Sequence, residues 1–165
     1  MPKFIIMIFL GPLFSNHVYA NDEWEQCSIL FTYSQLRADV KNSVAPQRLK
    51  ELLTQENRTL MESQTSDGLS DQVRTLTTCV QRIDPQIQSA KVEQCFPSFM
   101  VFPMAFVFRQ QSLDEKTARS LNAPSLDDKR VDQMIKFIYA KPVPEPGKRL
   151  SSKWSGEWMR QCLGQ

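Results

Sequence analysis

Four cysteines are the residues of this chain whose spacing says most about its chemistry. They are Cys27, Cys79, Cys95 and Cys162, and no two of them form a C-x-x-C pair. A redox-active dithiol and a haem attachment motif both need that spacing, so the sequence indicates neither. An even number of cysteines in a small exported chain is instead typical of two structural disulfides that form in an oxidising compartment.

The only histidine, His17, lies in a segment that we expect to be removed. Residues 1–20 combine a positive charge at Lys3, a short apolar stretch and the small residue Ala20 at the cleavage position. This is the pattern of a cleaved secretory signal peptide, whereas a retained membrane helix needs about 20 apolar residues. The mature chain then has no histidine, which removes Ser-His-Asp and Cys-His catalytic sites and every zinc site that needs an imidazole.

The mature chain, residues 21–165, is predicted to form a single helical domain. Its length of 165 − 20 = 145 residues is enough to bury a core. Loss of Lys3 leaves 20 − 1 = 19 basic against 18 acidic residues. This balance provides neither a basic surface for nucleic acid nor a polybasic face for lipid. We expect a protein partner, no nucleic acid, no stable membrane span, no cofactor and no metal, in the periplasm or, alternatively, secreted outside the cell.

Carboxylates are the remaining groups that could act as catalysts, on a glycan substrate. Residues 61–63 (MES) and 68–72 (GLSDQ) resemble the Glu-Ser and Gly-Leu-Met-Gln elements of lytic transglycosylases. The gap between the two elements is far too short for that family, and Ser-Asp stands in place of the methionine. We prefer to interpret the two elements as a helix end and a turn. A glycan hydrolase that uses Glu62 is kept as a third hypothesis, and no catalytic residue is predicted.

Trp154 and Trp158 lie four residues apart, and Cys162 continues the same helical face. Packing in the core beside a disulfide is the preferred interpretation of this pair. A partner-binding surface is the alternative, because tryptophan is enriched at binding hot spots. The proline-rich residues 141–149 are predicted to be an extended connector to this C-terminal helix.

Apolar residues at helical spacing predict the elements that position these side chains. The patterns predict helices over residues 23–42, from Pro46 to about residue 60, over 70–83 with Ser70 as the N-cap, over 85–95, from Ser125 onwards and over 151–163. We therefore predict an all-α domain of six or seven short helices around a buried Phe-rich segment, stapled by two disulfides.

The Phe-rich segment is residues 95–108, CFPSFMVFPMAFVF, which hold five of the ten phenylalanines and no charged residue. Pro97 and Pro103 interrupt it, and it is too short to cross a membrane. Burial of one phenylalanine contributes roughly 1.5–3 kcal/mol, so we predict a central core element. The alternative is a partly exposed binding groove, because methionines beside aromatic rings form adaptable surfaces.

An up-and-down arrangement of the first four predicted helices leads to a disulfide pairing. At about 1.5 Å per residue, Cys79 would lie high in the third helix, while Cys27 and Cys95 would lie low. A bridge needs Cα atoms within about 7 Å, which excludes both Cys79–Cys95 and Cys27–Cys79. The predicted pairs are therefore Cys27–Cys95 and Cys79–Cys162. A tilted fourth helix would instead allow Cys79–Cys95 together with Cys27–Cys162.

The function class follows from elimination. A small, bridged and nearly neutral exported chain without a recognisable catalytic motif favours a binding protein over an enzyme. The leading hypothesis is an inhibitor or immunity-type protein that blocks a toxin or a cell-wall hydrolase. The alternative is an accessory subunit of an envelope secretion or conjugation apparatus.

Overall fold

The computed structural model describes residues 22–39, 44–64, 68–121, 128–145 and 150–164, which contain helices and no strand. The all-α prediction is confirmed, with eight helices in these ranges where six or seven were predicted. They are α1 (Glu23–Asp39), α2 (Val44–Leu52), α3 (Gln55–Glu62), α4 (Leu69–Ile83), α5 (Ser89–Gln110), α6 (Glu115–Leu121), α7 (Lys129–Tyr139) and α8 (Leu150–Leu163).

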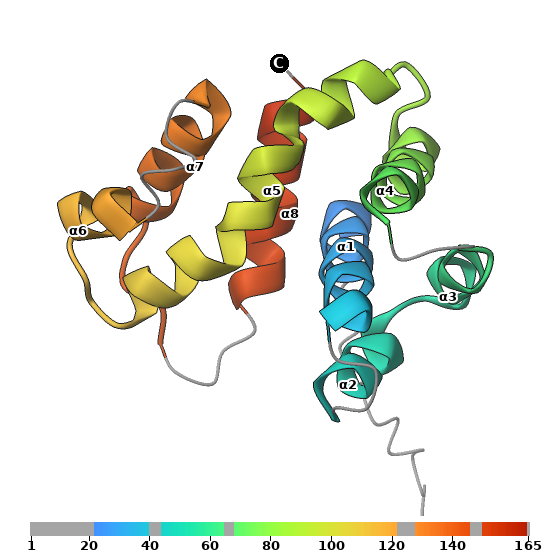
Figure 1. Ribbon diagram of the computed structural model, residues 1–165, viewed down its shortest axis with the longest axis horizontal. Helices are drawn as coiled ribbons and strands as arrows, with labels where there is room; N and C mark the ends of the chain where they lie inside the picture. The colour runs from blue at the N-terminus through green and yellow to red at the C-terminus, as the bar shows by residue number, and fades with distance from the viewer. Residues whose placement is uncertain (1–21, 40–43, 65–67, 122–127, 146–149, 165) are drawn as a thin grey trace, which may run out of the picture.

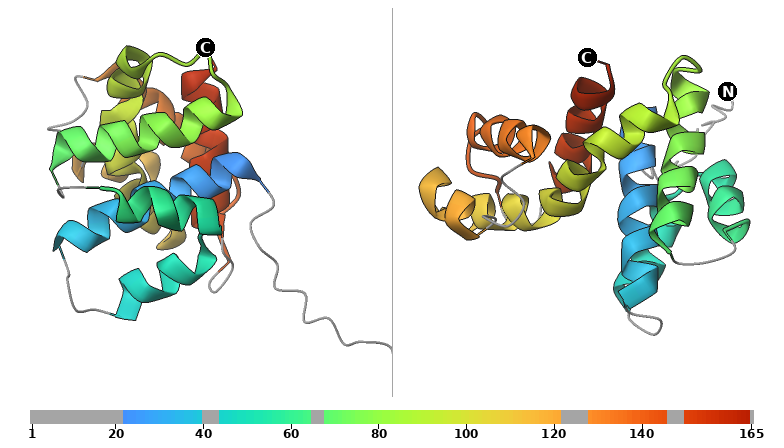
Figure 2. Two further views of the ribbon diagram at one scale, coloured as in Figure 1. Left: turned by 90° about the vertical axis from the view of Figure 1, so that its right-hand side faces the viewer. Right: turned by 45° about the horizontal axis from the view of Figure 1, so that its top comes forward.

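Helix α5 lies at the centre of the arrangement (Figure 1). Helices α6 and α7 lie on one side of it, α1 and α4 lie on the other, and α8 packs against both α5 and α1. Helices α2 and α3 both pack against α1 (Figures 1 and 2). Helices α1 and α8 therefore lie side by side next to the central helix.

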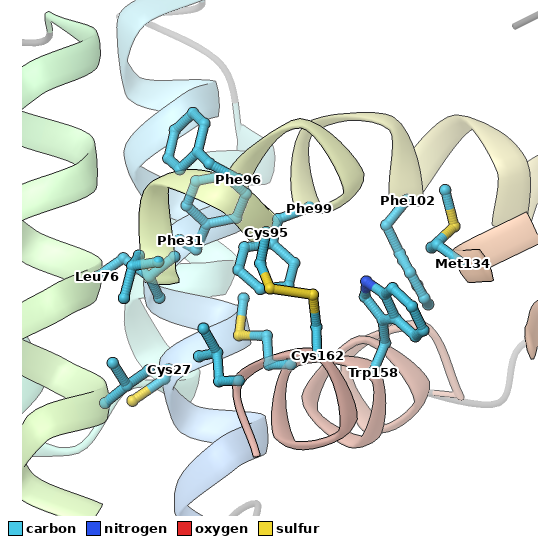
Figure 3. Packing of buried hydrophobic residues seen from close by; sticks show 14 of the residues in the cluster. Cys27, Phe31, Leu76, Cys95, Phe96, Phe99, Phe102, Met134, Trp158 and Cys162 are labelled. Atoms are coloured by element: carbon cyan, nitrogen blue, oxygen red, sulfur yellow. A yellow bond between two sulfur atoms is a disulfide. The ribbon is translucent and has the colours of Figure 1, made fainter. Parts of the chain in front are cut away.

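The Phe-rich segment forms most of α5, and its aromatic side is buried (Figure 3). The rings of Phe96 and Phe99 pack edge-on against Phe31 of α1, at centroid distances of 5.2 and 6.2 Å. Phe102 and Phe106 are also buried, and Phe106 meets Trp154 edge-on at 5.4 Å. The prediction of a central core element is therefore confirmed for this side of the helix.

Two prolines lie inside α5, although the helix continues through both. Pro97 and Pro103 each remove one backbone N–H from the helical ladder, and prolines at such positions bend helices. The ribbon of α5 curves along its length (Figure 1). Burial of the surrounding phenylalanines offsets the cost of each proline, which exceeds about 3 kcal/mol in an isolated helix interior.

Three predicted helix boundaries are wrong. The helix predicted from Pro46 is two helices, because Thr54 caps a new one by accepting a hydrogen bond from the backbone N–H of Asn57. Helix α4 has Gly68, not Ser70, at its N-cap position. The helix predicted over 85–95 starts later and belongs to α5, because residues 84–88 form a turn instead.

The two disulfides join Cys27 to Cys79 and Cys95 to Cys162, with Cα separations of 5.7 and 6.2 Å. Both predicted pairs, Cys27–Cys95 and Cys79–Cys162, are therefore wrong. The extra break between α2 and α3 adds a reversal of the chain, so that α4 runs opposite to α1 (Figure 2). Cys79 near the end of α4 then lies beside Cys27 near the start of α1.

The prediction misses the second bridge because it places Cys95 at the end of a separate short helix. It lies instead inside α5, where α8 packs alongside and brings Cys162 into reach (Figure 3). Each bridge ties together helices that are far apart in sequence, with separations of 52 and 67 residues. Chain-entropy arguments assign about 4 kcal/mol of stabilisation to each loop of this size.

Other predicted segments lie wholly or partly outside the described residues, among them residues 40–42 at the end of the first predicted helix and residues 125–127 at the start predicted from Ser125. The predicted signal peptide, residues 1–20, is outside them. Of the connector predicted over 141–149, the described part, 141–145, is non-helical as expected. Among the helices of the described ranges, none is both long and apolar enough to cross a bilayer.

Candidate functional site

One side of α5 carries exposed apolar side chains. Met100, Met104 and Val107 are 43%, 54% and 43% exposed. Residues three and four apart on a helix are neighbours on its surface, so these three form one stripe, which we call the methionine face. The two sequence interpretations of the Phe-rich segment therefore apply to two different sides of one helix: its aromatic side is core and its methionine side is surface.

An apolar cavity of about 210 Å³ opens beside the methionine face. It lies between α1, α2, α5 and α8, and we call it the serine-rimmed cavity. Pro103 links the two features, because it lines the cavity and is the helical neighbour of Met100, three residues before it, and of Val107, four residues after it. The apolar side chains that line the cavity are Ile29, Leu49, Leu52, Phe99, Phe102 and Pro103.

Hydroxyl groups from α1 and α8 line the other side of this cavity. The hydroxyl of Thr32 donates to the backbone carbonyl of Ser28 at 3.0 Å, and that of Ser152 donates to Oε1 of Glu25 at 2.6 Å. Ser28 itself is fully buried, and its hydroxyl has no hydrogen-bond partner. A buried hydroxyl without a partner is uncommon and costs free energy, and because Ser28 is 0% exposed, its hydroxyl does not face the open space of the cavity.

The two tryptophans that the sequence offers as an alternative partner-binding surface lie in the core. Trp154 and Trp158 are only 6% and 1% exposed. Nε1 of Trp158 donates to the buried hydroxyl of Ser98 at 2.9 Å. The preferred interpretation, core packing beside the Cys95–Cys162 disulfide, matches this placement, and neither ring is on the surface to contact a partner.

Glu62, the carboxylate that the glycan-hydrolase hypothesis needs, lies on the surface. Glu62 is the last residue of α3, and its side chain is 63% exposed and pairs with Lys50 at 3.4 Å. Residues 61–63 are thus a helix end, as the preferred interpretation expected. Residues 65–67, where the sequence predicts a turn, lie outside the described residues.

A smaller polar pocket of about 140 Å³ lies over the Cys27–Cys79 bridge. Arg82 is one of its lining residues, and the guanidinium group pairs with Glu56 at 3.1 Å and donates to Oδ1 of Asn57 at 3.1 Å. Because its charge is already paired, we interpret this pocket as part of the contact between α3 and α4.

The remaining comparisons concern metals and known proteins. Within the ranges that the structure describes, no group of three or more His, Cys, Asp or Glu side chains is placed to hold a metal ion.

The sequence does not predict the methionine face or the serine-rimmed cavity residue by residue, although the methionines beside aromatics in residues 95–108 are the signal that points to them. Compared with known proteins, the chain matches no family model, no curated protein and no solved structure.

Proposed function

We propose that this chain is a non-enzymatic binding protein of the periplasm. In this proposal its methionine face contacts another protein, and the contact blocks a toxin or a cell-wall hydrolase. The observation that carries the proposal is the exposure of Met100, Met104 and Val107 on the helix that also forms the centre of the core.

The chemistry of the methionine face favours a protein partner. Methionine side chains are flexible and polarizable, so a methionine-rich surface can adapt to the shape of a partner. Neighbouring exposed apolar residues often mark interaction sites, unlike single ones. Leu69 of α4 and Leu121 of α6 are exposed apolar residues on other helices, and they serve as controls.

The two disulfides support a location in the periplasm. Structural bridges form and persist in oxidising environments such as the periplasm. The rigid framework that they create also favours inhibition, because a preorganised surface loses little conformational entropy when it binds.

The test is a comparison of two double variants of the mature protein as baits for periplasmic extract. Met100→Glu with Met104→Glu places two charges on the methionine face. Leu69→Glu with Leu121→Glu places the same charges on other exposed apolar positions. We expect the first variant to lose a protein that wild type and the second variant both capture.

The captured protein is then purified, and its activity is measured with increasing amounts of wild-type protein. A toxin or hydrolase whose activity falls to a plateau at a stoichiometric ratio supports inhibition. A captured protein that belongs to a secretion or conjugation apparatus would support the alternative hypothesis. Equal capture by the two double variants would refute the methionine face as the binding surface.

A further inference from the structure

We propose that Met100 and Met104 are a modification site for peroxide-type oxidants, and that their reversible conversion to sulfoxides turns the methionine face from apolar to polar. The modification is inferred from the places that the sulfur-containing side chains occupy in the fold. Release of a bound protein by the modified face is its consequence, and only this consequence rests on the proposed function.

The exposed methionines of the described residues are confined to the methionine face. Met100 and Met104 are 43% and 54% exposed, whereas Met61, Met134 and Met159 are 2%, 0% and 0% exposed. All four cysteines are joined in disulfides, so no thiol competes for the oxidant. Because the rate of oxidation follows exposure, an oxidant reacts first at two side chains that lie about one helical turn apart.

The reaction needs only the thioether and the oxidant. A lone pair of Sδ attacks one oxygen of hydrogen peroxide, and the S–O bond forms as the O–O bond breaks. The departing hydroxide takes the proton of the transferred oxygen and leaves as water, so that sulfur loses the two electrons that the peroxide gains. Methionine sulfoxide reductases reverse the change; a pair of thiols in the reductase supplies two electrons, and the oxygen leaves as water.

The contact between α1 and α5 provides a donor for the new oxygen at Met100. Nε2 of Gln35 on α1 donates a hydrogen bond to Sδ of Met100. A thioether is a weak acceptor, whereas a sulfoxide oxygen is strongly polar and can accept from the same amide. Met104 is the more exposed of the two methionines, so its sulfoxide can be hydrated. Both oxidised side chains therefore fit on the surface and leave the aromatic side of α5 in place.

Oxidation changes what the methionine face can bind. Two flexible apolar side chains become polar ones, and a partner that covers them must remove water from two sulfoxide groups. Burial of a polar group without a compensating hydrogen bond is unfavourable, so we expect the affinity for an apolar partner surface to fall by about tenfold or more.

The first test uses the mature protein without a partner. Hydrogen peroxide is added until peptide mass analysis shows one added oxygen at Met100 and at Met104. We expect Met134 and Met159 to remain unmodified, retention on a hydrophobic-interaction column to shorten, and the melting temperature to change by no more than about 3 °C. Treatment with reductases for both sulfoxide epimers should restore the retention.

Three results of this test would overturn the proposal. Met134 and Met159 could oxidise as fast as the exposed pair, the melting temperature could fall strongly once only Met100 and Met104 are oxidised, or the retention could fail to recover with the reductases. The first would remove the selectivity of the site, and the other two would show damage to the fold instead of a reversible change of the surface.

Met100→Leu with Met104→Leu is the matched control, because leucine keeps the face apolar and has no sulfur to oxidise. Each protein is compared only with its own untreated sample. Peroxide should shorten the retention of wild type and leave that of the double variant unchanged. Equal shifts in the two proteins would assign the effect to other residues and would also overturn the proposal.

The second test measures affinity for the captured protein after the peroxide has been removed. Oxidised wild type should bind about tenfold or more weakly, and the reductases should restore binding. Unchanged affinity of oxidised wild type, where Met100→Glu with Met104→Glu abolishes capture, would overturn the release and leave the proposed binding face intact. If untreated wild type captures no protein through this face, the proposed function fails, and the first test alone decides the modification site.

Discussion

The indole Nε1–H of Trp158 donates a 2.9 Å hydrogen bond to the hydroxyl of Ser98, between α8 and α5. The hydroxyl of Ser98 in turn donates to the backbone carbonyl of Cys95 at 2.6 Å. Both side chains are almost fully buried, at 1% and 0% exposed. Because the Cys95–Cys162 bridge joins the same two helices (Figure 3), a covalent and a polar contact together fix α8 against the helix that carries the methionine face.

Removal of the hydroxyl should be costly because it leaves the indole N–H unpaired. We expect Ser98→Ala to lower the free energy of unfolding by about 1–3 kcal/mol, measured by urea denaturation. In a Trp158→Phe background the donor is absent, so the same substitution should cost close to nothing. Additive costs in this double-mutant cycle would show that the bond contributes little.

Gly156 should not tolerate a side chain, although it lies inside helix α8. A Cβ atom there would lie 2.7 Å from the backbone nitrogen of Glu25 and 2.8 Å from its Cα. Alanine normally stabilises a helix by about 1 kcal/mol relative to glycine, but here overpacking should reverse the sign and destabilise by about 1–3 kcal/mol. Lys153→Ala, on the exposed side of the same helix, is the control. A raised melting temperature for Gly156→Ala would mean that α1 and α8 are less tightly packed.

Two substitutions within α5 should separate its two sides. Phe102 is 1% exposed and Met104 is 54% exposed. We expect Phe102→Ala to cost about 3–5 kcal/mol and Met104→Ala to change stability by no more than about 0.5 kcal/mol. Thermal unfolding of both variants measures the difference. Similar losses for the two would mean that the methionine side is also part of the core.

Acid should weaken the contact between α6 and α7. Hydrogen bonds from Lys136 and Arg119 lower the pKa of Asp132 below its usual value of 3.8. Since the folded-state pKa is the lower one, the stabilisation is present above about pH 4 and is lost as the pH falls through the folded value. The side chain of Asp132 is 31% exposed, so Asp132→Asn should cost about 1 kcal/mol or less at pH 7.

Urea midpoints of wild type and Asp132→Asn, measured between pH 7 and pH 2, provide the test. The wild-type advantage should shrink below about pH 4 and vanish once Asp132 is protonated in both states. A difference that stays constant over this range would assign the effect of the substitution to packing.

The core and the fold class could be predicted because both follow from patterns within single segments. The apolar stripe of α7, which includes Val131, Met134, Ile135 and Ile138, is wholly buried as its spacing implies. The burial of the Phe-rich segment follows in the same way, because a segment with no charge favours a place away from water. Helix α6 was missed, since it has seven residues and one buried apolar side chain, Ala118.

The disulfide pairing could not be predicted because it depends on how often the chain reverses direction. One residue, Thr54, decides this by capping α3, and its signal is a single Thr-x-x-Asn in an otherwise continuous helical pattern. The candidate site could not be predicted from the sequence for a related reason. The serine-rimmed cavity combines residues from four helices, and no local pattern reports their contact.

Oxidation of methionines by dilute peroxide tests the central claim most directly, because the rate follows the exposure of each sulfur. In the free protein, Met100 and Met104 should oxidise much faster than Met134 and Met159, which are fully buried. With the captured partner at saturation, peptide mass analysis should show oxidation at Met100 and Met104 slowed by at least about fivefold, and unchanged at the two buried sites. Unchanged oxidation of Met100 and Met104 in an intact complex would contradict the assignment of the methionine face as the binding surface.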